Sequence, residues 1–81
     1  MDMITRAVEA IGSQVALANA IGVTPQAVNQ WVNGRRPVPA RLASSIERAT
    51  GIRCEELRPD IVWTRDTSGQ VTGYHVPLKV A

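Results

Sequence analysis

The chain contains, at residues 14–31, the sequence Gln-Val-Ala-Leu-Ala-Asn-Ala-Ile-Gly-Val-Thr-Pro-Gln-Ala-Val-Asn-Gln-Trp. This stretch has the pattern of two short helices joined by a tight turn, in which Gly22 supplies the positive φ that the turn requires. Ala18 must be small because the second helix crosses the first there. Thr24 is expected to cap the second helix. The pattern therefore predicts a helix-turn-helix with helices over residues 14–20 and 25–33.

The second of these helices has two chemically different faces. Its apolar residues Val28 and Trp31 are expected to point into the core. The opposite face carries four amides at the spacing i, i+3, i+4, i+7, namely Gln26, Asn29, Gln30 and Asn33. An amide offers a paired donor and acceptor that match the edge of adenine in the major groove of DNA, which admits one α-helix. A merely solvated face is the alternative, but Glu and Lys would be commoner there. The stripe predicts base-reading residues.

The charge of the chain is unevenly placed. Nine Lys and Arg against seven Asp and Glu give a net charge of +2. No acidic residue lies between Glu9 and Glu47, so that this block carries +3 and the remainder −1. Ordinary solubilising surface is one interpretation of its arginines. The other is contact with DNA phosphates, for which we predict Gln14, Thr24, Arg35, Arg36 and Arg41.

Further helices are expected on either side of this motif. Periodicity and capping signals predict helices over residues 3–11, with Asp2 as N-cap, and 39–50, followed by a single turn over 54–57. The fold class is therefore mainly α, a bundle of four to five helices forming a DNA-binding domain over residues 1–60. The side chains expected to point inward are Ile4, Ala7, Val8, Ile11, Val15, Leu17, Ala18, Ile21, Val23, Ala27, Val28, Trp31, Val32, Leu42, Ala43, Ile46 and Ala49.

The composition changes after Asp60. Residues 61–65 and 70–76 are rich in Val, Thr, Trp and Tyr, and the four residues 66–69 between them have turn chemistry, which predicts a β-hairpin within residues 61–81. A lone hairpin is marginal in water, so it should pack on the helices or pair with another chain. Trp63 and Tyr74 are candidate dimer-interface residues, although Trp63 could equally pack on the helical core. Lys79 to Ala81 are expected to form a loose end.

Several classes of protein are not expected. The longest uncharged stretch is interrupted by amides and is no membrane span, and no secretory signal is evident, which favours a cytoplasmic protein. The single cysteine, Cys54, and the single histidine, His75, provide neither a disulfide nor a zinc set. A buried thiol and a surface imidazole are favoured over a Cys/His catalytic pair. We predict no catalytic residues, no metal and no cofactor.

Several segments together resemble the Cro-like phage repressors, in particular their YdaS-type branch. They are Gly22-Val23-Thr24, Trp31, residues 33–39 (Asn-Gly-Arg-Arg-Pro-Val-Pro), 46–51 (Ile-Glu-Arg-Ala-Thr-Gly) and 56–60 (Glu-Leu-Arg-Pro-Asp), and the resemblance covers about three quarters of the chain. It implies a small bacterial or prophage transcriptional regulator, sometimes described as the antitoxin of a toxin–antitoxin pair. The tail from Thr64 onward does not match that branch.

Two functions follow as expectations. The first is a sequence-specific DNA-binding regulator, a repressor, that inserts residues 25–33 into the major groove as a homodimer on half-sites about 34 Å apart. The alternative is an antitoxin whose tail binds a toxin protein, with autoregulatory binding to DNA. An enzyme ranks third.

Overall fold

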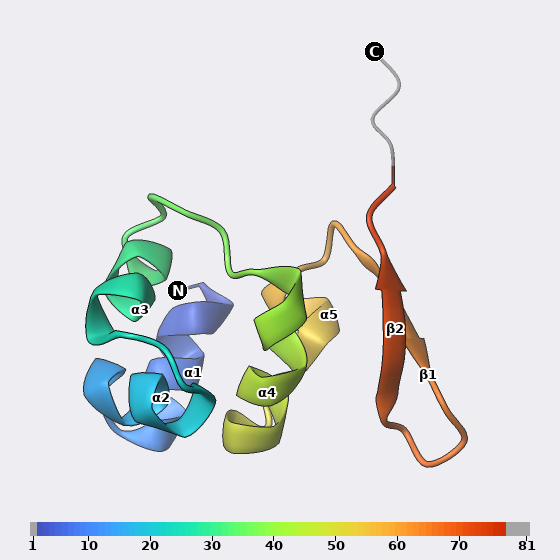
Figure 1. The fold of residues 1–81 in the computed structure, drawn as a ribbon, viewed down its shortest axis with the longest axis horizontal. Coiled ribbons are helices and arrows are strands. Elements are labelled where there is room, and N and C mark those ends of the chain that lie inside the picture. Colours follow the sequence, from blue (N-terminus) through green and yellow to red (C-terminus); the bar gives the residue numbers. More distant parts are fainter. Residues whose placement is uncertain (1, 78–81) are drawn as a thin grey trace.

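A computed structural model describes residues 2–77 of the chain as five helices followed by a two-stranded hairpin (Figure 1). The predicted mainly α fold with a C-terminal hairpin is confirmed. The predicted loose end at Lys79 to Ala81 lies outside the described residues. No helix in the described part is long and apolar enough to cross a membrane. The elements are α1 (Met3–Ile11), α2 (Gln14–Ile21), α3 (Pro25–Val32), α4 (Ala40–Thr50), α5 (Cys54–Leu57), β1 (Val62–Arg65) and β2 (Val71–His75).

The first three helices begin at side-chain caps, and those at Asp2 and Thr24 are the predicted ones. The side-chain oxygens of Asp2, Ser13 and Thr24 accept hydrogen bonds from the backbone N–H three residues later, at 2.9, 3.0 and 3.1 Å. Each bond satisfies a donor that the first turn of a helix leaves without an internal partner, and such a cap contributes about 1 kcal/mol. The hydrogen bond also lowers the pKa of the Asp2 carboxyl.

The turn between α2 and α3 has the geometry expected of its glycine. Gly22 has φ 78° and ψ 34°, a left-handed conformation that an L side chain rarely adopts. The backbone N–H groups of Gly22 and Val23 both donate to the carbonyl of Ala18, at 2.9 and 3.0 Å. This pair of bonds ends α2 and turns the chain directly into α3.

The core is centred on the two helices of the motif. Leu17, Ala18 and Val28 are fully buried, and Trp31 is nearly so. They pack against side chains from the neighbouring helices and the α3–α4 loop, namely Ile4, Ala7, Val38 and Ile46. Ala18, Val28 and Trp31 thus lie buried in the core between the helices, where close packing requires small or well-fitted side chains.

Two residues that were expected in the core are exposed. Val15 is 53% exposed, because at 100° per residue it lies about 110° from the mean direction of the inward residues of α2. Ala49 is exposed for the same reason, since it lies about 90° from the mean direction of Ala43 and Ile46 on α4.

The helix and strand ends differ slightly from the sequence prediction. Asn33 is the C-cap of α3 rather than a helical residue, and Ile21 still belongs to α2. Pro39 is the N-cap of α4, with extended backbone (ψ 135°), although its carbonyl already accepts from Leu42 at 3.0 Å. The strands are shorter at their open ends, since Ile61 and Val76 lie outside them.

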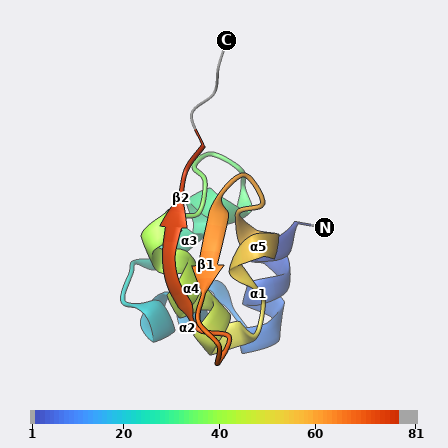
Figure 2. The same ribbon diagram turned by 90° about the vertical axis from the view of Figure 1, so that its right-hand side faces the viewer.

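The hairpin lies against α4 and α5, on the side of the body away from α2 and α3 (Figures 1 and 2). Its strands are antiparallel, with Trp63 opposite Tyr74 and a bulge between Thr64 and Arg65. The indole Nε1 of Trp63 donates to the carbonyl of Arg58 at 3.1 Å, and the ring lies 5.5 Å from that of Tyr74. Trp63 therefore packs on the helical body, while Tyr74 stays 48% exposed.

A cluster of charges that was not anticipated fastens the hairpin to the helices. The guanidinium of Arg65 donates to the carboxylate of Glu47 on α4 and to the carboxylate of Glu55 on α5. It also donates to the backbone carbonyl of Gly69 at 2.6 Å. Glu47 also accepts from the backbone N–H of Cys54 at 2.9 Å. The guanidinium lowers the pKa of Glu47 and, to about 2, that of Glu55. The partners are 18 and 10 residues from Arg65 in sequence, so no local spacing could have revealed them.

Candidate nucleic-acid interface

The four predicted amides share the outer face of α3. Gln26, Asn29 and Asn33 are exposed and Gln30 is half-buried, while Val28 and Trp31 of the same helix face the core. The amphipathic arrangement expected from the spacing is thus present. It leaves a stripe of uncharged donors and acceptors on a helix whose outer surface is open to solvent.

Some of these amides are joined to one another. The Nδ2 of Asn29 donates to the Oε1 of Gln14 at 3.2 Å, and the Nδ2 of Asn33 donates to the Oδ1 of Asn29 at 2.9 Å. The side chains of Gln26 and Gln30 make no hydrogen bond within residues 2–77. The stripe therefore combines two unengaged amides with two that are held in place, and it brings Gln14 from α2 to its edge.

The arginines that follow α3 are presented at its C-terminal end. The backbone N–H groups of Arg35 and Arg36 donate to the carbonyl of Gln30, at 2.9 and 3.3 Å, across the left-handed Gly34 (φ 73°). Both side chains are exposed, as is that of Arg41 in the first turn of α4. None of the three takes part in an ion pair within the described residues.

Three arginines near the hairpin lie beside carboxylates. Arg58 and Arg65 are engaged by Asp60 and by the two glutamates of the hairpin cluster, and Arg53 lies 3.9 Å from Glu55. The uneven charge seen in the sequence thus becomes a division in space. The α3 side carries unpaired positive charge, whereas the charges beside the hairpin are mostly paired within the protein.

The remaining two predicted phosphate contacts lie at helix starts. Gln14 is the first residue of α2 and is half-buried. Thr24 precedes α3, and although its hydroxyl oxygen accepts from Ala27, its own O–H remains available as a donor. Both positions adjoin the first turn of a helix, where the helix dipole favours an anion.

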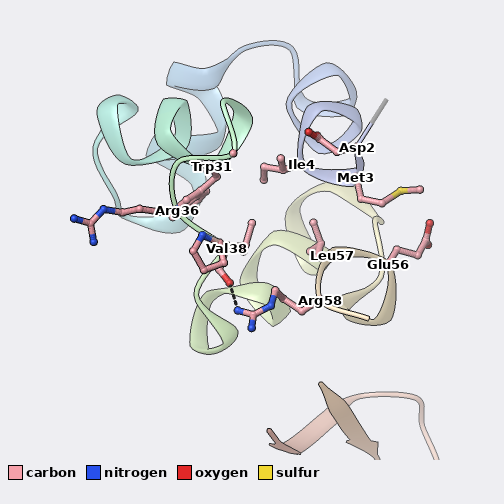
Figure 3. A pocket seen from close by; sticks show the side chains of 11 residues that line it. Asp2, Met3, Ile4, Trp31, Arg36, Val38, Glu56, Leu57 and Arg58 are labelled. Carbon is pink, nitrogen blue, oxygen red and sulfur yellow. Dashed lines mark hydrogen bonds between the residues drawn. The ribbon is translucent and has the colours of Figure 1, made fainter. Parts of the chain in front are cut away.

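A surface pocket lies elsewhere on the molecule. A pocket of 410 Å³ opens between the start of α1, the α3–α4 loop and α5 (Figure 3). Its apolar lining includes Ile4, Trp31, Val38 and Leu57, and the Arg36 side chain extends away from it (Figure 3). None of the four amides borders it. The candidate interface is therefore a convex helical surface rather than a cavity.

The cysteine lacks the environment of a nucleophile. Cys54 is fully buried, and desolvation raises the pKa of its thiol to about 11, so that it stays protonated at neutral pH. His75, in contrast, is exposed on β2. Within residues 2–77, no group of three or more His, Cys, Asp or Glu side chains is arranged to hold a metal.

A helix-turn-helix packed in a five-helix body, with amides and arginines on one outer side, defines a Cro-like helix-turn-helix protein, an architecture used by DNA-binding regulators. A similar solved structure is that of the Cro protein from a prophage element, Xfaso 1, of Xylella fastidiosa strain Ann-1, at 42% identity and a TM-score of 0.68, covering 74% of this chain and 94% of that one. A second is XPH1, a hybrid sequence of Xfaso 1 and Pfl 6, at 44% identity and a TM-score of 0.55, with the same coverage.

The chain belongs to the YdaS family, whose description reads "Bacterial toxin YdaS" and which matches residues 4–66. A relative in Escherichia coli (strain K12), named "Putative transcriptional regulator YdaS", is 52% identical over 56 residues. That match spans 67% of this chain and 57% of the relative, so the chain covers little more than half of the relative's length. The family match includes β1 and ends before β2.

Proposed function

We propose that this protein is a sequence-specific DNA-binding transcriptional repressor that inserts α3 into the major groove and acts in the bacterial cytoplasm, on the nucleoid. The observation that carries the proposal is the outer face of α3, where Gln26, Asn29, Gln30 and Asn33 present amides and no charge. Such side chains read base edges, whereas the flanking arginines contact phosphates without regard to sequence.

The surrounding geometry supports this docking. Arg35 and Arg36 follow α3 directly, and Thr24 precedes it. Gln14 and Arg41 lie at the starts of the neighbouring helices α2 and α4. A helix lying in the groove has phosphates on both sides, so that donors before and after it are what the duplex requires. The hairpin lies away from α3 and leaves this face clear (Figure 1).

Selection from a pool of random duplexes tests the proposal. The expected result is an enriched, near-palindromic motif whose half-sites lie about one helical turn, or 34 Å, apart. A pool that yields no motif, together with equal affinity for unrelated duplexes, would contradict sequence-specific reading. Binding to every sequence that weakens steeply with salt would then define a non-specific DNA-binding protein instead.

The hairpin is the proposed dimerisation arm. Three of its large apolar side chains are exposed, namely Val62 (55%), Val76 (52%) and Tyr74 (48%), and Val62 lies on the face opposite to the Trp63–Tyr74 pair. Trp63, although docked on the body, completes the cross-strand aromatic pair. An apolar surface on a two-stranded sheet with open edges is well suited to pairing with a second copy.

Matched substitutions test the arm. Val62→Lys with Val76→Lys should convert a dimer into a monomer in sedimentation equilibrium, whereas Val15→Lys, at an equally exposed valine on α2, should not. Unchanged association in the hairpin variant would contradict the assignment.

The family's description as a toxin keeps the antitoxin alternative in view, in which the hairpin binds a toxin protein. Ending the chain after Arg65 separates the two. Joint loss of self-association and DNA binding supports the dimerisation arm, and retention of both with loss of a partner protein supports the antitoxin.

A further inference from the structure

Three amides form a continuous chain across the outer surface of the helix-turn-helix. We infer that Asn29 is a positioning residue, which holds the amide of Gln14 with its amino group outward, as a donor to a DNA phosphate, and the amide of Asn33 with its oxygen outward. The inference rests on the proposed DNA-binding function. It adds that the phosphate contact of Gln14, on α2, and the base contact of Asn33, at the end of α3, both depend on the orientation of Asn29.

The direction of the chain decides what each end can bind. Gln14 uses its Oε1 to accept from the Nδ2 of Asn29 at 3.2 Å, so its Nε2 amino group remains without a partner among residues 2–77. Phosphate oxygens are acceptors only, and a neutral side chain can bind them only with a donor. The end of the chain at the start of α2 therefore has the chemistry that a phosphate needs.

The other end has the opposite chemistry. Asn33 donates its Nδ2 to the Oδ1 of Asn29 at 2.9 Å, which leaves its own Oδ1 as the outward group. That oxygen cannot bond a phosphate, but it can accept from the amino group of adenine or cytosine in the major groove. The chain thus presents a donor on the α2 side and an acceptor on the α3 side.

Asn29 fixes both ends because it lies between them. If its amide turned over, Nδ2 and Oδ1 would exchange places, and both neighbours would have to turn over to keep their hydrogen bonds. Gln14 and Asn29 also come from different helices, 15 residues apart, whose inner sides are packed through Ala18 and Val28. The packed core therefore fixes the two helices relative to each other, and the hydrogen bond between Gln14 and Asn29 orients the side chains on their outer surface.

The substitution Asn29→Asp tests the role of the donor. A carboxylate at this position still accepts from Asn33 but cannot donate to Gln14. Gln14 can then keep the link only by turning its amino group inward, which leaves its oxygen facing the phosphate. Asn19→Asp is the matched control, because it makes the same amide-to-carboxylate change at an exposed residue of α2 that lies outside the chain of amides and outside the proposed DNA contacts.

Single phosphates of the selected site, replaced one at a time by neutral methylphosphonate, give the readout. At the phosphate that Gln14 contacts, methylphosphonate should lower the affinity of the wild-type protein about tenfold, which is the effect of one hydrogen bond to a charged group. The same replacement should not change the affinity of Gln14→Ala, which identifies this phosphate. Asn29→Asp should lose no affinity at that phosphate either, whereas Asn19→Asp should keep the tenfold loss. A full loss in Asn29→Asp would overturn the inference while leaving the proposed function standing, and the absence of any selected site would contradict the function itself.

A measurement without DNA tests the same point. In NMR hydrogen exchange, one amino proton of Asn29 should be protected in the wild-type protein while those of Gln14 exchange freely. In Asn29→Asp the Gln14 protons should become protected. Protected Gln14 protons in the wild-type protein would mean that the chain runs in the other direction, and the inference would be wrong.

Discussion

Replacing Arg35 and Arg36 together by Gln should flatten the salt dependence of DNA binding. Both side chains are exposed, follow α3 directly and pair with no acidic group in the described structure, so each is available to one phosphate. Because the slope of log K against log salt changes by about 0.9 per phosphate contact, two contacts per chain correspond to about 1.8, and a bound dimer to about 3.6. Between 50 and 200 mM salt, the wild-type dimer should therefore lose about 150-fold more affinity than the variant, and a bound monomer about 12-fold more.

Fluorescence anisotropy on the selected duplex and on a scrambled one measures this difference. The change should be the same on both duplexes, since phosphate contacts carry no sequence information. Arg48→Gln with Arg53→Gln removes two exposed charges from the end of α4 and the residue before α5, and it should leave the slope almost unchanged. An unaltered slope in the Arg35 and Arg36 variant would refute the phosphate assignment.

Two further predictions concern the body and the hairpin. Ile46→Ala removes a fully buried side chain and should lower the free energy of unfolding by about 2 to 5 kcal/mol, which thermal denaturation would show as a fall in Tm, whereas a Tm within a few degrees of the wild-type value would contradict the core described above. The pKa values of Glu47 and Glu55 are lowered, so each carboxylate contributes fully to stability above the ordinary value of 4.5 and loses this contribution as the pH falls through its lowered pKa, which for Glu55 is about 2. The indole N–H resonance of Trp63 should therefore shift over that window as the hairpin loosens, and Glu55→Gln should weaken the docking already at neutral pH; a resonance unchanged down to pH 2 would mean that other contacts hold the hairpin.

The parts of the structure that could be predicted depend on neighbours in sequence. Asp2, Ser13 and Thr24 each cap a helix through a bond three residues away, and Gly22 acts on its own backbone, so local patterns suffice. The amide stripe follows from helical geometry alone. The prediction that Val15 lies in the core was wrong because burial depends on distant parts of the chain. The hydrophobic pattern of a short helix does not indicate which of its sides the other helices will cover.

The contacts that could not be predicted join distant segments. The attachment of Arg65 to Glu47 and Glu55 depends on how the hairpin folds back over α4 and α5. The bond between Gln14 and Asn29 depends on the crossing of α2 and α3. In both cases the sequence contains the partners but not the angle that brings them together, and that angle is set by the packed core.

The reading of bases by the α3 amides is tested most directly by measuring affinity for every single-base variant of the selected site, with the wild-type protein and with Gln26→Ala. Gln26→Ala should lose base discrimination at one position in each half-site, by about 1 to 3 kcal/mol, and retain it at the others. Arg35→Gln, as the control, should weaken all variants by the same factor. A Gln26→Ala protein that keeps every base preference, or that binds all variants more weakly by the same factor, would contradict base reading by the α3 amides.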